Sequence, residues 1–223
     1  MKNYFITITL CLFVFLTANA QNVNLVNDLG LLDQSELDAV TERIIQKVDD
    51  FQVAVQDLAR IGNMSGSAKQ ELSAQTIKLF IGDGKPYHVK DIYGRDTIHS
   101  AVTMSTISSK YKGRRTRQPM VSYLQMLVKR SMDRTYRYKK VIIEAADAVR
   151  VDNLSKIGDG RYIATAHILQ HFVGFRGDGM KMYEDYTAKT ITIYINRFEQ
   201  TTPDGEIKYW DIKLGDIDCN DIW

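Results

Sequence analysis

The sequence predicts an α+β fold in which a curved antiparallel sheet of about four to six strands wraps around three N-terminal and central helices. Before residue 138, apolar residues recur at steps of three and four, which is the spacing of one helix face. After residue 138, apolar and polar residues alternate in segments that turn sequences separate, as in antiparallel strands with one buried face. We therefore expect the helices to cover the apolar face of the sheet.

The first helix is expected from residue 33 to about residue 60. Asp33-Gln34-Ser35-Glu36 has the capping-box pattern, in which the first side chain accepts a hydrogen bond from an early amide of the helix. Gly62 is expected to stop the helix. Between these signals, one apolar stripe contains Leu37, Val40, Ile44, Val48, Phe51, Val55 and Leu58.

Two further helices are expected on similar grounds. Ser67-Ala68-Lys69-Gln70 is a second capping box, and the segment that it begins should end at Gly82-Asp83-Gly84. Pro119 suits the first turn of a third helix, because the amide hydrogen that it lacks has no partner there. The apolar stripe of this third helix contains Val121, Leu124, Leu127, Val128 and Met132.

The first two strands are expected to form a hairpin. Alternation from Tyr138 to Val151 predicts one long strand, and Gly158-Asp159-Gly160 predicts the turn that follows it. The second strand should begin near Tyr162. Its inner face is expected to contain Tyr162, Ala164, Ala166, Ile168 and Phe172.

Two more strands complete the predicted sheet. A polar loop is expected from Arg176 to Tyr186, followed by a third strand that contains Ile191, Ile193 and Ile195. Pro203-Asp204-Gly205 then predicts a turn into the fourth strand, from Ile207 to Leu214. Residues 218–223 would form a C-terminal tail.

The first twenty residues predict export. Lys2 precedes an apolar run, and Ala18-Asn19-Ala20 supplies the small residues of a signal-peptidase site. The apolar run is too short to span a bilayer comfortably, so a cleaved signal peptide is favoured over an anchor. We expect cleavage after Ala20, a flexible mature N-terminus over residues 21–32, and a periplasmic or secreted protein without a transmembrane segment.

Cysteine usage excludes a disulfide scaffold. The chain has two cysteines, and Cys11 lies inside the predicted signal peptide. Cys219 is therefore alone in the mature chain and cannot form an internal disulfide. Its place in the acidic C-terminal segment, without an activating base nearby in the sequence, predicts no nucleophilic role.

The order of elements resembles the nuclear transport factor 2-like superfamily, a cone-shaped fold shared with ketosteroid isomerase and its SnoaL-like relatives. The resemblance covers most of residues 33–217, which we expect to form one domain, and it departs from compact members at residues 93–116, an insertion or extra hairpin. It implies a pocket at the open mouth of the cone. Members of this superfamily are enzymes, ligand binders or interaction modules, and the fold alone does not choose among them.

Asp147 is the candidate base of an enzyme. It falls on the apolar face of the first predicted strand, where loss of solvation makes a carboxylate a stronger base. Tyr162 or Tyr194 would donate a hydrogen bond to a developing oxyanion. A β-bulge between Ala145 and Val149 would instead turn Asp147 away from that face.

Positive charge is concentrated between residues 110 and 140, where eleven lysines and arginines face the single acid Asp133. Such a segment can bind polyanions through phosphate contacts, although export argues against nucleic acid as the partner. The alternative is a solvated face that pairs with the acidic C-terminal segment of the same or a neighbouring chain. The candidate anion or partner patch consists of Lys112, Arg114, Arg115, Arg117, Arg130 and Arg134.

His167 and His171 have the four-residue spacing of a metal pair, but no metal site is expected. The intervening residues lack the glutamate of a zinc-protease helix. On a strand, both histidines would lie on the face opposite Tyr162, which we expect to face solvent.

These features favour an exported, non-enzymatic module that binds an unknown small ligand or an envelope protein and needs no cofactor. A small lyase or isomerase of the ketosteroid-isomerase type is the first alternative, with Asp147 as its base. A component of a cell-envelope assembly, held by the basic segment, is the second. An uncovered apolar sheet face would also allow a homodimer.

Overall fold

The structure is a computed structural model that describes residues 32–90, 93–108, 114–203 and 205–222. The predicted signal peptide, Lys112 and all but the last residue of the predicted flexible N-terminus lie outside these residues. None of the helices in the described ranges combines the length and the apolar character that crossing a bilayer requires.

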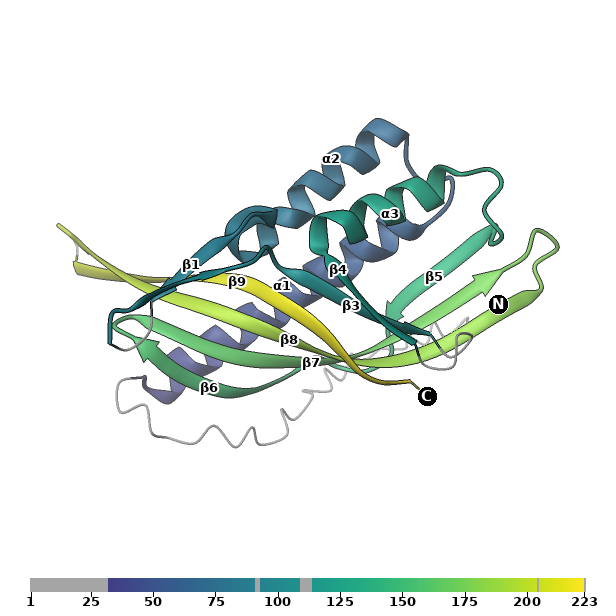
Figure 1. The fold of residues 1–223 in the computed structure, drawn as a ribbon. Helices are drawn as coiled ribbons and strands as arrows, with labels where there is room; N and C mark the ends of the chain where they lie inside the picture. Colours follow the sequence, from purple (N-terminus) through teal and green to yellow (C-terminus); the bar gives the residue numbers. More distant parts are fainter. Residues whose placement is uncertain (1–31, 91–92, 109–113, 204, 223) are drawn as a thin grey trace, which may run out of the picture.

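The described chain contains three α-helices and a seven-stranded mixed sheet, which confirms the predicted α+β class (Figure 1). The helices are α1 (Gln34–Ala59), α2 (Gly66–Thr76) and α3 (Met120–Met132), and two short 3-10 segments, Ile77–Leu79 and Ile81–Gly84, follow α2. The strands are β1 (Tyr87–Lys90), β2 (Asp96–His99), β3 (Thr103–Ser108), β4 (Arg114–Pro119), β5 (Lys140–Ala145), β6 (Arg150–Gly158), β7 (Arg161–Phe175), β8 (Lys181–Thr202) and β9 (Gly205–Ile222).

The sheet is larger than the predicted four to six strands, and it is not wholly antiparallel. Its order is β4-β3-β9-β8-β7-β5, with β6 also paired to β7, while β1 and β2 form a separate two-stranded sheet. β3 runs parallel to β9, with Met104 opposite Ile217. Two of the additional strands are β3 and β4, which lie within or overlap the stretch 93–116, and another arises because the first predicted strand is divided into β5 and β6. β4 is the edge strand on this side.

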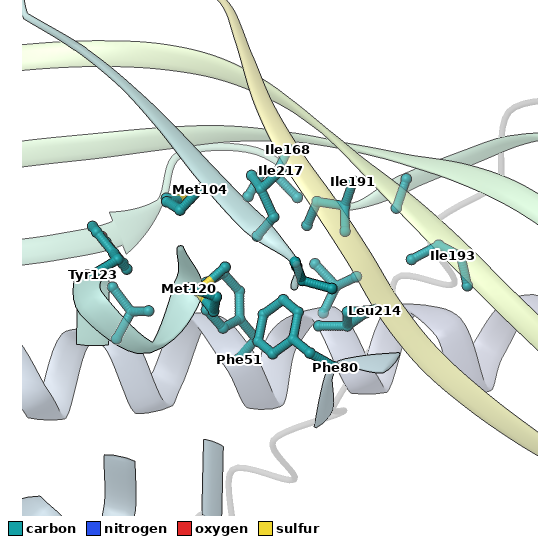
Figure 2. Close-up of a cluster of buried hydrophobic side chains, with 14 of the residues drawn as sticks. Phe51, Phe80, Met104, Met120, Tyr123, Ile168, Ile191, Ile193, Leu214 and Ile217 are labelled. Atoms are coloured by element: carbon teal, nitrogen blue, oxygen red, sulfur yellow. The ribbon is translucent and has the colours of Figure 1, made fainter. Parts of the chain in front are cut away.

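α1 begins and packs as its sequence predicts. The Glu36 amide donates to the Asp33 side chain at 2.8 Å, and the helix runs from Gln34 to Ala59. The apolar stripe of α1 faces the sheet, and helix and sheet share one core. Figure 2 shows Phe51 of this helix close to Phe80, Met120 and Leu214. The buried apolar residues of the stripe are Val40, Ile44, Val48, Phe51, Ala54, Val55, Leu58 and Ala59.

The capping residue of α2 lies two residues before the predicted cap, Ser67, so that prediction is wrong in detail. Ser65 is the residue that caps the helix, because its hydroxyl accepts from the Ala68 amide at 3.2 Å. The Ser67 hydroxyl instead lies 3.0 Å from that of Ser65. α2 packs on α1 and α3 and forms an outer layer. The predicted third helix is α3, but it begins at Met120, so Pro119 is its capping residue and does not lie in its first turn.

The single long strand predicted between Tyr138 and Val151 is two strands. β5 ends at Ala145, the chain bends through residues 146–149, and β6 begins at Arg150. Both strands pair with β7, β5 near its C-terminal end and β6 near its N-terminal end. The amide of Ala146 donates to the Leu169 carbonyl at 2.7 Å, so the bend stays beside β7. The predicted turn at residues 158–160 is confirmed.

The loop predicted from Arg176 to Tyr186 is mostly strand. β8 begins at Lys181 and runs for 22 residues between β7 and β9. β9 continues to Ile222 instead of ending near Leu214. Residues 218–222 are therefore part of the sheet, and the predicted C-terminal tail over this stretch is wrong.

A histidine on the outer face of the sheet ties three strands together. His171 Nδ1 lies 3.1 Å from a carboxylate oxygen of Glu144, and Nε2 lies 2.9 Å from one of Glu184. The ring also stacks on Tyr186 at 4.3 Å between centroids. Burial lowers the pKa of His171, but the hydrogen bonds to Glu184 and Glu144 outweigh it and the pKa is raised. His167 lies on the same outer face, 2.9 Å from Asp152.

The raised pKa of His171 makes this contact pH-dependent. A group whose pKa is higher in the folded state stabilises that state at low pH, and this contribution is lost as the pH rises through the folded-state pKa. We expect the stability difference between the native chain and His171→Gln to be larger at about pH 6 than at about pH 8. Urea unfolding of both proteins at the two pH values measures this difference, and equal differences would contradict it.

Candidate ligand cavity

A cavity of about 740 Å³ lies between α3, the β3–β4 hairpin and the inner face of the sheet. α3 and its neighbours contribute Tyr123, Met126, Leu127, Arg130, Tyr136, Arg137 and Tyr138. The β3–β4 hairpin contributes Thr106, Ile107, Arg114, Thr116, Arg117 and Gln118. The sheet contributes Ile143, Gln170, Phe172, Tyr183, Asp185, Thr187, Lys189 and Cys219.

The cavity lies where the inner face of the sheet changes from apolar to polar. Ile191, Ile193 and Ile195 on β8 are fully buried members of the core. Two-residue alternation places Lys189, Thr187 and Asp185 on the same face, farther toward the start of the strand. β7 changes in the same way from Ile168 to Gln170. These polar side chains do not pack into the apolar core, and the cavity lies at this end of the inner sheet face.

Lys189 lies at the floor of the cavity. Its side chain is 4% exposed, and its Nζ donates a hydrogen bond to Gln170 Oε1 at 2.5 Å. It forms no ion pair with a carboxylate among the described residues. Burial lowers the pKa of Lys189 to about 8, and the nearby Cys219 offsets only part of this effect. A buried cation without a countercharge favours the approach of an anion.

Cys219 lies directly opposite Lys189, on β9. It is fully buried, which corrects the prediction that placed it in a terminal tail. Its Sγ donates to the Ser105 carbonyl at 2.8 Å, and burial raises the pKa of the thiol. Burial likewise raises the pKa of Tyr123 on α3. Both groups therefore remain protonated and uncharged at neutral pH, and the positive charge of Lys189 is the dominant one at the floor.

Four arginines surround the cavity on its solvent side, and we call them the mouth arginines. They are Arg114, Arg117, Arg130 and Arg137, and all four are exposed. Arg117 pairs with Asp218 on β9, and the Arg137 guanidinium lies 4.5 Å from the ring centroid of Tyr138. Of the described residues that line the cavity, Asp185 is the one acidic residue. The lining is strongly positive, which favours anions.

One side of the cavity is an aromatic wall formed by Tyr136, Tyr138, Phe172 and Tyr183. Consecutive rings of this wall are 5.5, 5.9 and 5.7 Å apart between centroids. Tyr138 can lie on β7 because Gly174 has no side chain there, since a Cβ at Gly174 would be 2.7 Å from the Tyr138 ring. Consecutive rings meet at interplanar angles of 90°, 62° and 61°, so the wall offers both ring faces and ring edges to a ligand.

Asp147 does not contribute to this site, and its predicted position on an apolar strand face is wrong. It lies in the exposed bend between β5 and β6 and does not line the cavity. Its Oδ1 accepts a hydrogen bond from the Ala148 amide at 2.8 Å. The physical reason is the break in the predicted strand after Ala145, which turns the intervening residues toward solvent.

The predicted oxyanion donors, Tyr162 and Tyr194, also lie outside the cavity. Tyr162 is buried, with its ring 5.9 Å from that of Trp210. Tyr194 points to the opposite face of β8, where its hydroxyl lies 3.4 Å from that of Tyr87 on β1. The structure thus does not bring either tyrosine together with Asp147 at the cavity.

The predicted basic patch divides into cavity and non-cavity residues. Arg114, Arg117 and Arg130 line the cavity, whereas Arg115 and Arg134 do not. Arg115 donates to the Asn220 carbonyl of β9 at 3.3 Å. The predicted pairing of the basic segment with the acidic C-terminal segment is present in part, in the ion pair between Arg117 and Asp218.

Comparison of this chain with models of protein families, with curated proteins and with solved structures found no match. Function is therefore inferred from the geometry of the cavity.

The sequence pattern contained a signal for the floor residues. Lys189 has the same alternation parity as Ile191, Ile193 and Ile195, so extension of that strand by two residues places its side chain inward. Because a polar loop was predicted from Arg176 to Tyr186, the strand was assigned from its isoleucines alone and Lys189 was not recognised as an inward-facing residue. No comparable signal pointed to Cys219, which lies beyond the predicted end of the last strand.

Proposed function

We propose that this protein is an exported ligand-binding module whose cavity holds a small amphipathic anion. The acid group of the ligand is held by Lys189 at the floor or by the mouth arginines. Its apolar or aromatic body lies against the aromatic wall. This proposal retains the binding module expected from the sequence and the export that its first twenty residues indicate.

The observation that carries the proposal is that Lys189 is buried without an acidic partner among the residues that the structure describes. Desolvation of an ammonium group costs free energy that an ion pair normally offsets. In the described structure, Gln170 supplies one neutral acceptor. A bound carboxylate, sulfonate or phosphate would supply the missing charge, so ligand binding would stabilise this region.

The size and chemistry of the cavity support the same class of ligand. Pockets for small molecules are typically about 300 to 1,000 Å³ and combine apolar walls with a few convergent polar groups. The cavity volume of about 740 Å³ lies within that range. The aromatic wall and Leu127 supply the apolar part, while Lys189 and Gln170 supply the polar groups.

We also propose that the chain is a divergent member of the nuclear transport factor 2-like superfamily. The support is the order of elements, with helices before a long, curved run of antiparallel strands (Figure 1), and a cavity at one end of the inner sheet face. The β3–β4 hairpin lines one side of this cavity, so the stretch 93–116, which departs from compact members, takes part in the proposed site.

A matched pair of fluorescent probes tests the binding proposal. We expect 1-pyrenebutyrate to bind at least about tenfold more tightly than 1-pyrenebutanol, because only the former carries a charge and a charge-assisted hydrogen bond contributes about 1.5–3 kcal/mol. Fluorescence titration of the native protein measures both affinities. Equal affinities for the acid and the alcohol would overturn the proposal, and this result requires no variant.

Variants locate the binding within the cavity. Lys189→Met should weaken pyrenebutyrate binding by about tenfold or more, and Arg130→Gln by a smaller factor because Arg130 is exposed. Arg134→Gln is the matched control, because Arg134 is also an exposed arginine but does not line the cavity. An equal loss of affinity in Arg130→Gln and Arg134→Gln would place the anion outside the cavity.

A further inference from the structure

We propose that Lys189 forms an imine with aldehyde or ketone ligands that enter the cavity, so that the site captures carbonyl-bearing acids covalently and reversibly. This inference rests on the proposed function, since the same cavity admits the ligand. It goes further by naming the reactive atom, Nζ of Lys189, and the reactive group of the ligand.

The surroundings of Lys189 are suited to amine chemistry. The side chain is 4% exposed, and its amine contacts the neutral Gln170 amide instead of a carboxylate that would hold the proton. Lysines become nucleophiles when an apolar or desolvated site disfavours the ammonium form. Lys189 is one of the residues that line the cavity, so a ligand that fills the cavity contacts this side chain.

The charge state of the amine agrees with this geometry. Burial lowers the pKa of Lys189 from 10.5 to about 8. At about pH 7.5, roughly one quarter of such amines are unprotonated, compared with about one in a thousand for a lysine with an ordinary pKa. Burial also lowers the pKa of Lys69, but that residue is completely buried, donates to three backbone carbonyls and does not line the cavity. Lys189 should therefore react faster than the exposed lysines with a carbonyl that enters the cavity.

Cys219 does not compete for the ligand, although it faces Lys189 across the strand pair. Thiols react with carbonyls as thiolates, and burial raises the pKa of this thiol. The thiol hydrogen of Cys219 is also held in a hydrogen bond to the Ser105 carbonyl. The amine is therefore the nucleophile of the floor.

The reaction balances without an added oxidant or reductant. The Nζ lone pair attacks the carbonyl carbon, and the proton that nitrogen loses passes to the carbonyl oxygen to give a carbinolamine. The carbon–oxygen bond then breaks, the hydroxyl leaves as water with a second proton from nitrogen, and a carbon–nitrogen double bond remains. Amine and carbonyl are thus converted into imine and water. The mouth arginines can hold an acid group on the same ligand.

Reductive trapping with 4-carboxybenzaldehyde tests the inference. The native protein is incubated with this aldehyde, treated with borohydride to convert any imine into a stable secondary amine, and mapped by peptide mass spectrometry. We expect the modification at Lys189 to exceed that at exposed Lys129 at least about tenfold near pH 7.5. Modification of Lys189 no greater than that of Lys129 would overturn the inference.

The pH profile of trapping provides a second readout. The trapped fraction at Lys189 should rise with a midpoint near the pKa of about 8, whereas the fraction at exposed lysines should keep rising at higher pH. Among the described residues, the titratable and charged groups that share the cavity with Lys189 are the mouth arginines, the tyrosines of the aromatic wall, Tyr123, Asp185 and Cys219. A profile at Lys189 identical to that at Lys129 would contradict the proposed environment.

Two variants separate covalent capture from anion binding. Lys189→Arg keeps the positive charge but removes the amine, so we expect pyrenebutyrate to bind while trapping in the Lys189 peptide is lost. Lys129→Arg is the matched control and should leave trapping at Lys189 unchanged. If pyrenebutyrate binds the native protein but Lys189 is not selectively trapped, the imine inference fails and the proposed function stands. If Lys189 is selectively trapped but the protein binds the acid and the alcohol equally, the imine inference stands and the proposed anion binding fails.

Discussion

Replacement of Phe51 by alanine is expected to lower the free energy of unfolding by about 4 kcal/mol, because the change removes an aromatic ring from a packed core and leaves a cavity. Phe51 is fully buried, and its ring meets that of Phe80 edge to face at 5.2 Å between centroids. Figure 2 shows both rings between α1 and the sheet. Urea unfolding followed by circular dichroism measures the loss.

Val53→Ala is the matched control for this change. Val53 lies on the same helix two residues away, but its side chain is 57% exposed. Its replacement should change the free energy of unfolding by no more than about 0.5 kcal/mol. Similar losses in Phe51→Ala and Val53→Ala would contradict the packing of α1 on the sheet.

Replacement of Lys69 by methionine is expected to cost about 3 kcal/mol, because it leaves several buried carbonyl oxygens without a donor. Lys69 is completely buried, and its Nζ donates to the carbonyls of Leu58 at 2.9 Å and Asp57 at 3.1 Å, and to that of Arg60. These carbonyls lie at the C-terminal end of α1, where a cation is also favoured by the helix dipole. A methionine side chain is similar in length to that of lysine but cannot donate a hydrogen bond.

Lys78→Met is the control for the loss at Lys69. Lys78 is exposed and lies just after α2, the helix that contains Lys69. Its replacement should change the free energy of unfolding by at most about 0.5 kcal/mol. Both variants are compared with the native chain by urea unfolding. A loss at Lys69 no greater than that at Lys78 would show that the buried amine does not hold the end of α1.

The helices and the central strands were predictable because their signals are local. The Asp33 cap depends on residues three positions apart, and the alternation from Tyr162 to Ile168 depends on a single strand with one buried face. Both were confirmed. The start of α2 was misplaced because Ser65 and Ser67 are equally good capping residues, and only the structure shows which hydroxyl receives the Ala68 amide.

The wrong position predicted for Asp147 shows why the alternation of apolar and polar residues did not locate the end of β5. Ala145 and Val149 are four residues apart, so a bend between them leaves the alternation undisturbed. The break is visible only in the pairing, where β5 and β6 contact different parts of β7. Long-range pairing of this kind has no signature in a local window of sequence.

The start of β8 was missed for a reason that concerns function. Prediction of a strand relied on apolar residues on the inner face, but Asp185, Thr187 and Lys189 are polar. These three polar residues line the cavity. The polarity that suits them to ligand binding also removed the apolar alternation by which a strand is predicted. The end of β9 was missed for a different reason. Its buried residues change parity, from Ile212 and Leu214 to Ile217 and Cys219, across the register shift between β8 and β9.

The most direct test of the proposed function is a crystal structure of the protein with 1-pyrenebutyrate. We expect the ligand between α3 and the sheet, with its carboxylate within hydrogen-bond distance of Lys189 or a mouth arginine and its ring system against Tyr138 and Phe172. A ligand bound elsewhere on the protein, or a cavity filled by the protein's own side chains at saturating ligand, would contradict the proposal.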